Sequence, residues 1–320
     1  IGGWSQLTAA SLTLPGAARA QHSWSSIAGE KYAAIGTSQG LFLYYANDFY
    51  DISPLAAAIT GFTFTTTNGS ATVTVNKTSH GLSAGRYFTF TSVTLPGSGT
   101  GYVAADFTGT PYEVVTASTN SFTITMASTE SGAGITAAGS ATVNPYEEVG
   151  PTFQTAGYGW GTDTWSSSTW GTESTTSDVI LEPGKWSLDN FGEVLVATIT
   201  GGKTFTWNAG ASGARAIRAS TTTTNFSTSN NPTSSRLTQV SDRDRHLFHF
   251  GTETTIGDTS TVDPMFIRFS NQEDLNTYTP TSTNTAGSFR LDKGNKIVGA
   301  VSGKDYTLVL TDSSAYVIQF

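Results

Sequence analysis

The sequence contains no cysteine, and only 12% of its 320 residues are charged. Without cysteine, the chain can be neither a disulfide scaffold nor a protein with a thiolate-bound zinc ion. The glycines follow no collagen period, the residues that build coiled coils are scarce, and no apolar run approaches the roughly 20 residues that span a bilayer. The aromatic content of 12% excludes general disorder. These absences leave a folded globular protein with a weakly charged surface.

The residues that are abundant favour strands. The chain has 55 threonines, 34 glycines, 18 phenylalanines and 12 tyrosines. Threonine and the aromatic residues are enriched in strands, and glycine serves the turns between them. The composition therefore predicts an all-β protein, and the length allows more than one domain. Helix is expected only in short turns such as Asn271–Asn276.

Four segments share one pattern, which is a mostly apolar strand, a turn, and a second strand that carries an aromatic residue. Their apolar runs are nearly continuous, as is typical of strands covered on both faces. In the first segment, Gly40 is expected to supply the positive φ that a tight hairpin turn favours. The four segments are residues 31–45, 193–208, 245–270 and 305–320.

The spacing of these hairpins indicates a long-period repeat. Their turns lie near residues 38, 201, 257 and 312, so the last two intervals are 56 and 55 residues. The first interval is 163 residues, and it falls to 73 if residues 57–146 are a 90-residue insertion. This recurrence predicts a β-propeller, with the first blade or blades in residues 1–56 and further blades in residues 147–320. A pair of β-sandwiches is the alternative, although sandwich strands recur at shorter spacing.

The insertion has a different pattern. Residues 57–146 alternate between apolar and polar positions with a period of two, and turns rich in glycine, asparagine and serine separate the runs. This pattern predicts a compact antiparallel β domain of five or six strands. Residues 131–140, with three glycines, are expected to form its exit linker. A surface loop between blades tolerates such an insertion at a small entropic cost.

Two further stretches are predicted to be loops. Residues 157–172 space Trp160, Trp165 and Trp170 five apart. These rings can stack on sugars, or they can pack onto the blades or a neighbouring subunit. The three tryptophans are therefore candidates for an interface or packing loop. Residues 219–235 are polar and of low complexity, as expected of a long connection at a blade rim.

The four histidines do not form a metal-binding pattern. His246 and His249 are three residues apart, and in a strand this spacing places them on opposite faces. His80 lies in a glycine-containing turn, and His22 is remote from the others in the sequence. The sequence therefore predicts no metal site and no cofactor site.

The acidic residues offer one candidate for catalysis. Asp242 and Asp244 could serve as a carboxylate pair of the kind that glycosidases use. Arg243 and Arg245 alternate with them and would keep both carboxylates ionised, which favours a salt network before a strand. The Glu273–Asp274 pair is predicted to lie in a turn. Neither a nucleophile elbow nor a phosphate-binding loop motif occurs, so no catalytic residue is assigned and the chain is not expected to be an enzyme.

Seven stretches carry long, ordered motifs: residues 32–37, 50–54, 157–172, 185–197, 244–251, 263–274 and 279–291. They resemble a family of virion proteins from short-tailed bacteriophages, the tail nozzle or hub proteins. Residues 79–86 resemble a small β module that recurs in phage structural proteins, where Asp is more frequent at the position of Arg86. The resemblance implies a β-propeller body, several copies in a ring, and a central conduit for DNA, with no active site.

Two functions of different classes follow as expectations. The first is a structural virion protein of a phage tail, a nozzle or hub that forms a homo-oligomeric ring of about six copies around the DNA-ejection conduit. It would be assembled in the host cytoplasm, would contact adaptor and fibre proteins, and would need no membrane-spanning segment. The alternative is a propeller that binds or cleaves glycans.

The charge balance and the ends of the chain add two further expectations. Lys and Arg number 16 against 24 Asp and Glu, and they are scattered, so sequence-specific binding of nucleic acid is not expected. An acidic wall would instead let DNA pass without holding its phosphates. The sequence opens at Ile1 and closes at Phe320 within a strand-like run, which predicts a fragment of a longer polypeptide.

Overall fold

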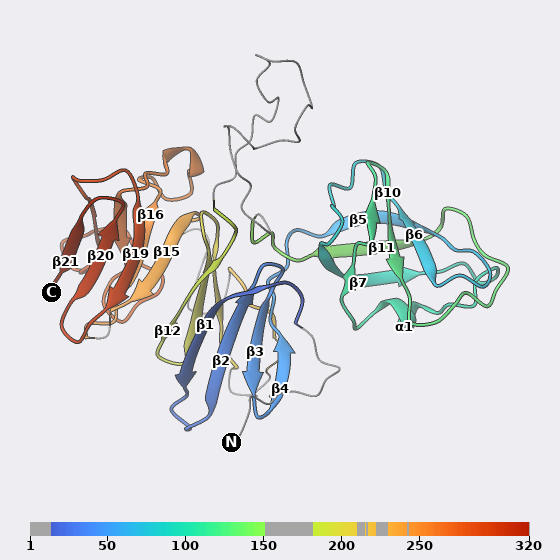
Figure 1. Ribbon diagram of the computed structural model, residues 1–320, viewed down its shortest axis with the longest axis horizontal. Helices are drawn as coiled ribbons and strands as arrows, with labels where there is room; N and C mark the ends of the chain where they lie inside the picture. Colours follow the sequence, from blue (N-terminus) through green and yellow to red (C-terminus); the bar gives the residue numbers. More distant parts are fainter. Residues whose placement is uncertain are drawn as a thin grey trace, which may run out of the picture. The chain divides into compact units, whose positions relative to one another are not determined.

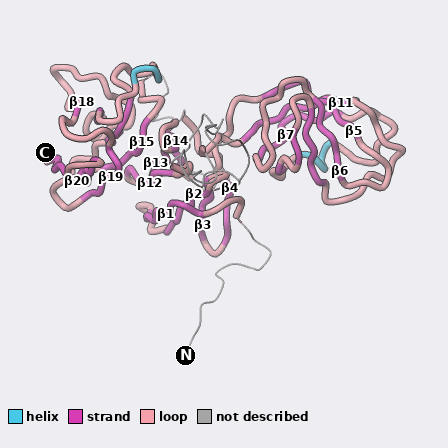
Figure 2. The backbone as a smooth tube through the Cα atoms, turned by 45° about the horizontal axis from the view of Figure 1, so that its top comes forward, coloured by secondary structure: helices cyan, strands magenta, loops and turns pink. Residues whose placement is uncertain are grey.

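The computed structural model describes residues 14–150, 182–209, 215, 217–221, 230–241 and 243–319. Strands dominate these residues, and helix is limited there to α1 (Ala104–Phe107) and η1 (Thr259–Thr261) (Figure 2). The prediction of an all-β protein is thus confirmed. No helix in the described ranges is long and apolar enough to cross a membrane. The chain divides into unit 1, with Ile1–Ile52 and Val149–Phe320, and unit 2, with Ser53–Glu148.

The described residues of unit 1 form four antiparallel sheets, which we call blades 1 to 4 (Figure 1). Each sheet consists of strands that follow one another in the sequence. Blade 1 consists of β1 (Ala18–Ser25), β2 (Lys31–Thr37), β3 (Leu41–Tyr45) and β4 (Asp48–Asp51). Blade 2 consists of β12 (Trp186–Phe191), β13 (Val194–Ile199) and β14 (Thr204–Trp207). Blade 3 consists of β15 (Ser235–Val240), β16 (Leu247–Thr252), β17 (Phe266–Phe269) and β18 (Gly287–Arg290). Blade 4 consists of β19 (Ile297–Ser302), β20 (Thr307–Thr311) and β21 (Ala315–Ile318).

The four expected hairpins are present as β2–β3, β13–β14, β16–β17 and β20–β21. Two local expectations were wrong. Residues 271–276 form a turn rather than a helix. Gly40 is not among the glycines with positive φ, and the turn before it is held instead by Thr37, whose Oγ1 accepts hydrogen bonds from the amides of Gln39 and Gly40.

Neighbouring blades pack face to face through apolar clusters. Trp24, Leu43, Leu195 and Trp207 belong to the cluster between blades 1 and 2. Smaller clusters join blade 2 to blade 3 and blade 3 to blade 4. The first strands also lie side by side, since β1 contacts β12, β12 contacts β15, and β15 contacts β19. Sheets stacked in sequence order with adjacent first strands form the propeller-like body that the repeat predicts.

A close approach between blades 1 and 2 depends on Gly36 of β2. A Cβ atom at this position would lie 2.5 Å from Cδ1 of Trp186, the first residue of β12. The indole is buried, and its Nε1 donates a hydrogen bond of 3.0 Å to the carbonyl oxygen of Thr37. The missing side chain therefore lets the ring pack directly on the backbone of β2.

Unit 2 is a single seven-stranded antiparallel sheet in the order β8-β7-β11-β5-β6-β10-β9. Its strands are β5 (Ile59–Thr65), β6 (Thr72–Asn76), β7 (Tyr87–Thr94), β8 (Tyr112–Glu113), β9 (Thr116–Ala117), β10 (Ser121–Thr125) and β11 (Ala138–Pro145). Five or six strands were expected, and the two-residue strands β8 and β9 account for the difference. The expected linker at residues 131–140 is also shorter than predicted, because β11 begins at Ala138.

The sheet of unit 2 curls around one core of phenylalanine and β-branched side chains. Phe62, Phe64, Phe88 and Phe122 are all buried in it. The register of β11 shifts against both β5 and β7, and such bulges bend a sheet. Gly139 lies at one shift with φ of 77°, where a Cβ atom would come within 2.6 Å of the carbonyl oxygen of Thr94.

Candidate functional site

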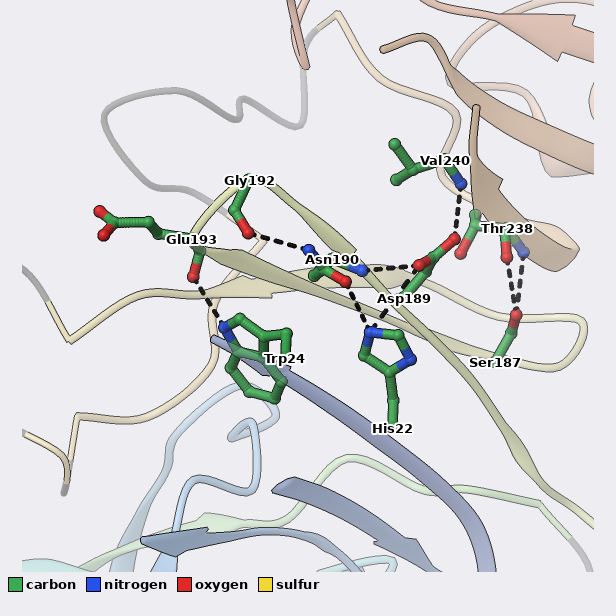
Figure 3. Close-up of polar contacts among 9 residues, drawn as sticks. All are labelled: His22, Trp24, Ser187, Asp189, Asn190, Gly192, Glu193, Thr238 and Val240. Atoms are coloured by element: carbon green, nitrogen blue, oxygen red, sulfur yellow. Dashed lines mark hydrogen bonds and ion pairs between the residues drawn. The ribbon is translucent and has the colours of Figure 1, made fainter. Parts of the chain in front are cut away.

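The first strands of blades 1, 2 and 3 meet at a group of polar residues (Figure 3). We call this group the first-strand cluster, and it consists of His22, Ser187, Asp189, Asn190, Thr238 and Val240. Its side chains come from β1 and β12, and the backbone of β15 supplies the remaining groups. The first strands of successive blades face the axis of a propeller, where ligands or channels are found. The first-strand cluster is therefore the candidate functional site.

Two side chains of β12 satisfy the free backbone edge of β15. The hydroxyl of Ser187 donates to the carbonyl oxygen of Thr238 at 2.9 Å and accepts from its amide at 3.2 Å. Two residues further along each strand, Oδ2 of Asp189 accepts from the amide of Val240 at 2.7 Å. The period of two in both strands makes this possible, because alternate side chains of β12 face alternate outward amides of β15.

The same cluster joins β12 to blade 1. Nε2 of His22 lies 2.8 Å from Oδ1 of Asn190, and 3.8 Å from Oδ1 of Asp189. Asn190 is itself fixed, because its side-chain amide donates to the carbonyl oxygen of Gly192 at 2.9 Å. Next to it, the indole of Trp24 donates to the carbonyl oxygen of Glu193 at 3.2 Å.

These contacts make the first-strand cluster a clamp between blades rather than an acid–base pair. Both oxygens of Asp189 already accept backbone hydrogen bonds, from Val240 and from Asn190 at 2.8 Å. The long distance to His22 leaves that imidazole bonded to an amide rather than to the carboxylate. An unpaired backbone edge is costly when it is buried, so side chains that bond it stabilise the stack.

Sequence reasoning did not find the first-strand cluster. A usable signal exists in residues 186–191, Trp-Ser-Leu-Asp-Asn-Phe, where Ser187 and Asp189 alternate with the apolar residues Trp186 and Leu188. Such short polar side chains at strand positions are candidates for bonding a neighbouring backbone. The sequence analysis used residues 185–197 as a family motif and predicted no strand at residues 186–191, which form β12.

The histidines of blade 3 are core residues. His249 is fully buried, with Nδ1 lying 2.8 Å from the hydroxyl of Ser235 and Nε2 lying 3.1 Å from the hydroxyl of Tyr278. Burial, together with the charge of Arg268, lowers the pKa of His249 to about 3. His246 precedes β16, and its Nδ1 lies 2.7 Å from the carbonyl oxygen of Ser270. Ser235 and His249 are both buried, so their hydrogen bond lies inside the core of blade 3.

Of the charged residues 242–245, the structure describes Arg243, Asp244 and Arg245, and Asp242 lies outside the described residues. Asp244 and Arg243 line a shallow depression with the turn between β19 and β20, where Lys304 and Tyr306 lie. Arg245 instead pairs with Glu273 at 2.9 Å. The expected turn at Glu273–Asp274 is present and forms the acidic side of this pair. Trp160, Trp165 and Trp170 also lie outside the described residues, as do residues 222–229 of the predicted loop 219–235.

Most of the other arginines of unit 1 that the structure describes form ion pairs. Arg218 lies 2.8 Å from Asp51, and Arg290 lies 2.6 Å from Asp263. Arg215 pairs with Glu30 and stacks over the ring of Tyr45 at 4.1 Å. Hydrogen bonds from Tyr32 and Tyr45, with Arg215 alongside, lower the pKa of Glu30. Arg236 and Lys296 share the carboxylate of Glu182.

Comparison with known proteins adds little. No protein-family model matches the chain, and no curated protein matches it. Among solved structures, one named phage phi92 endosialidase is 15% identical, with a TM-score of 0.25 over 90% of this chain and 41% of that one. The chain thus spans less than half the length of that protein. A TM-score this low shows neither a shared fold nor a shared activity, so the assignment of function must come from the chain itself.

Proposed function

We propose that the chain is a structural protein of a bacteriophage tail, a nozzle or hub that forms a ring around the path of the ejected DNA. The family resemblance, which covers most of residues 1–56 and 150–320, implies this function, and the propeller-like body agrees with it. The observation that supports it most is that arginines of unit 1 form ion pairs with carboxylates. Cations bonded to carboxylates are not available to hold phosphates.

The ion pairs would matter because of how proteins hold DNA. Each lysine or arginine that neutralises a phosphate adds salt-dependent affinity, and a ring multiplies every such contact by its copy number. Arg215, Arg218, Arg245 and Arg290 each face a carboxylate of unit 1. Together with the net charge of -8, this arrangement favours a wall along which DNA slides.

The first experiment measures particle mass and DNA affinity on the purified chain. Native mass spectrometry should give a closed oligomer, and fluorescence anisotropy with short duplex DNA should show no binding at physiological salt. Labelling of virions with an antibody against the chain should mark the tail. Tight, salt-resistant DNA binding, or label on the capsid alone, would contradict the proposal.

The alternative of a glycan-active propeller predicts other results in the same samples. A monomer that releases oligosaccharides from a glycan would replace the ring. The depression beside Asp244 and Tyr306 would then be the site to test, and Asp244→Asn would abolish the release. A ring with no glycan activity would exclude this alternative.

A further inference from the structure

Residues 182–184, which we call the strap, lead into β12, the first strand of blade 2. The backbone of the strap is closely packed at Gly184, where a Cβ atom would lie 2.0 Å from the carbonyl oxygen of Val149. The carbonyl oxygen of Gly184 also accepts a hydrogen bond from the side chain of Arg19, in the first strand of blade 1. Pro183 stiffens the strap, because its ring fixes φ. The strap is therefore held in a defined position on unit 1.

The carboxylate of Glu182, at the start of the strap, bonds two further blades at once. Nη2 of Arg236, in the first strand of blade 3, lies 2.5 Å from Oε2, and Nζ of Lys296 lies 2.5 Å from Oε1. The hydrogen bond from Lys296, together with that from Arg236, lowers the pKa of Glu182, so its carboxylate is ionised at neutral pH. One glutamate thus neutralises cations from two blades.

The basic residues around the strap lie at the same end of the first strands. Arg19 is the second residue of β1, Arg236 is the second residue of β15, and Lys296 directly precedes β19. The first strands of these blades lie side by side with β12 between them. Because the first strands of a propeller face its axis, the strap and its cations lie beside the path that the proposed function gives to DNA.

The bond between Glu182 and its two cations is of a kind that a phosphate can replace. Carboxylate and phosphate oxygens accept hydrogen bonds from the same arginine and lysine groups. The side chains of Glu182, Arg236 and Lys296 are 42%, 22% and 41% exposed, and ion pairs at this exposure are individually weak. The glutamate therefore occupies the position that a DNA phosphate would take between the two cations.

We propose that Arg236 and Lys296 form a latent site for the backbone phosphates of DNA, and that Glu182 masks this site. With the strap in place, the two cations add nothing to the affinity of the channel wall for DNA. When the strap moves away, the wall gains about two phosphate contacts in each copy and holds the DNA. The inference rests on the proposed function and deepens it, because it names a control on the movement of DNA through the channel.

Glu182→Gln tests the masked site, because it removes the charge of the strap and keeps the size of the side chain. Fluorescence anisotropy of the full chain with a labelled duplex of about 20 base pairs gives the affinity and its salt dependence. We expect DNA affinity at least about tenfold tighter than that of the unchanged chain at low salt, with a log–log salt slope steeper by about two. Adding Arg236→Gln and Lys296→Gln to this variant should abolish the gain.

Asp263→Asn is the matched control. It also removes a carboxylate that pairs with an arginine of blade 3, but this arginine, Arg290, lies on β18, the last strand of that blade. We therefore expect Asp263→Asn to leave the DNA affinity unchanged. An equal gain in Asp263→Asn and Glu182→Gln would mean that net charge alone sets the affinity, and this result would overturn the proposal.

A second variant keeps the test decisive if Glu182→Gln is less stable. Arg236→Gln combined with Lys296→Gln, in a chain that keeps Glu182, should leave the DNA affinity unaltered, because masked cations bind no phosphate. A loss of affinity in this variant would show that the cations are already available and would overturn the proposal. A Glu182→Gln variant with a lower thermal midpoint and unchanged DNA affinity would make Glu182 a structural tie between blades, which also overturns it.

The outcomes separate this inference from the proposed function. Rings that are found in the tail, but in which Glu182→Gln brings no gain in DNA affinity, overturn the masked site and leave the nozzle standing. A gain in DNA affinity in a chain that is monomeric and absent from the tail supports the masked site and overturns the nozzle.

Discussion

Glu130 in unit 2 is a buried carboxylate that the protein keeps ionised. It is 1% exposed, and its oxygens accept hydrogen bonds from the amide of Gly132 at 2.8 Å, from the amide of Gly101, and from the hydroxyl of Thr100 at 2.7 Å. Burial alone would raise the pKa of this carboxyl. The hydrogen bonds outweigh burial and lower its pKa from the ordinary 4.5 to about 2.

This depressed pKa predicts an acid-sensitive unit 2. The native carboxyl binds its proton less readily than the unfolded one, so its contribution to stability is complete above pH 4.5 and is lost as the pH falls toward 2. Glu130→Gln should lower the unfolding free energy at pH 7 by about 2–3 kcal/mol, because amide hydrogens would face the backbone donors. Glu148→Gln, with a side chain 70% exposed, is the control. Equal pH profiles for both variants would contradict the account.

The first-strand cluster makes a prediction about blade stability. Asp189→Ala should destabilise unit 1 by about 1–3 kcal/mol, because the amide of Val240 would lose its acceptor. Ser23→Ala, at an exposed position of β1, should change stability by less than about 0.5 kcal/mol. Urea unfolding followed by tryptophan fluorescence measures both. A neutral Asp189→Ala variant would show that the clamp does not hold the blades together.

At the scale of elements, the sequence predicted the hairpin strands of each blade better than the first strands. The apolar runs of β13, β16 and β20 are easy to recognise in the sequence, because each of these strands lies between two other strands of its sheet. The first strands were not predicted. Residues 18–25 of β1, for example, read Ala-Arg-Ala-Gln-His-Ser-Trp-Ser, with polar residues on its exposed side. The polar contacts of these strands depend on the next blade, which no local pattern reveals.

The same limit applies to the candidate site. The sequence singled out Asp242, Asp244 and the tryptophans at 160, 165 and 170 because charge clusters and repeated rings are conspicuous. The residues that bridge blades 1 and 2, His22 and Asn190, are 168 positions apart and share no motif. Their proximity comes from the stacking of blades 1 and 2 across the insertion, which is a property of the tertiary structure.

Gly36 in β2 should be essential for docking blade 2 on blade 1. Gly36→Ala would place its Cβ within 3 Å of three atoms of Trp186 and should lower stability by about 1–3 kcal/mol. Gly299→Ala in β19 is the matched control, since a Cβ there meets nothing within 4 Å. Thermal unfolding of the two variants tests the prediction. An unchanged midpoint for Gly36→Ala would mean that the indole can move without loss.

At the scale of the whole molecule, unit 2 is expected to be separable from the blades. The amide of Ala56 bonds the carbonyl oxygen of Pro145 at 2.8 Å, so the chain enters and leaves unit 2 at neighbouring points. Replacing residues 58–144 with a short Gly-Ser bridge should leave unit 1 folded, with cooperative unfolding near the original midpoint. Insolubility of this variant, or loss of cooperativity, would show that residues 57–146 belong to the core of the blades.

The central claim is that copies of this chain surround a path for DNA. An electron cryo-microscopy map of the assembled particle, at side-chain resolution, tests it most directly. The account predicts a ring whose channel wall carries hydroxyl and carboxylate groups, with Arg215, Arg218 and Arg245 in ion pairs. A chain outside any ring, or a channel lined by unpaired Arg215, Arg218, Arg243 or Arg245 that face the axis, would contradict it.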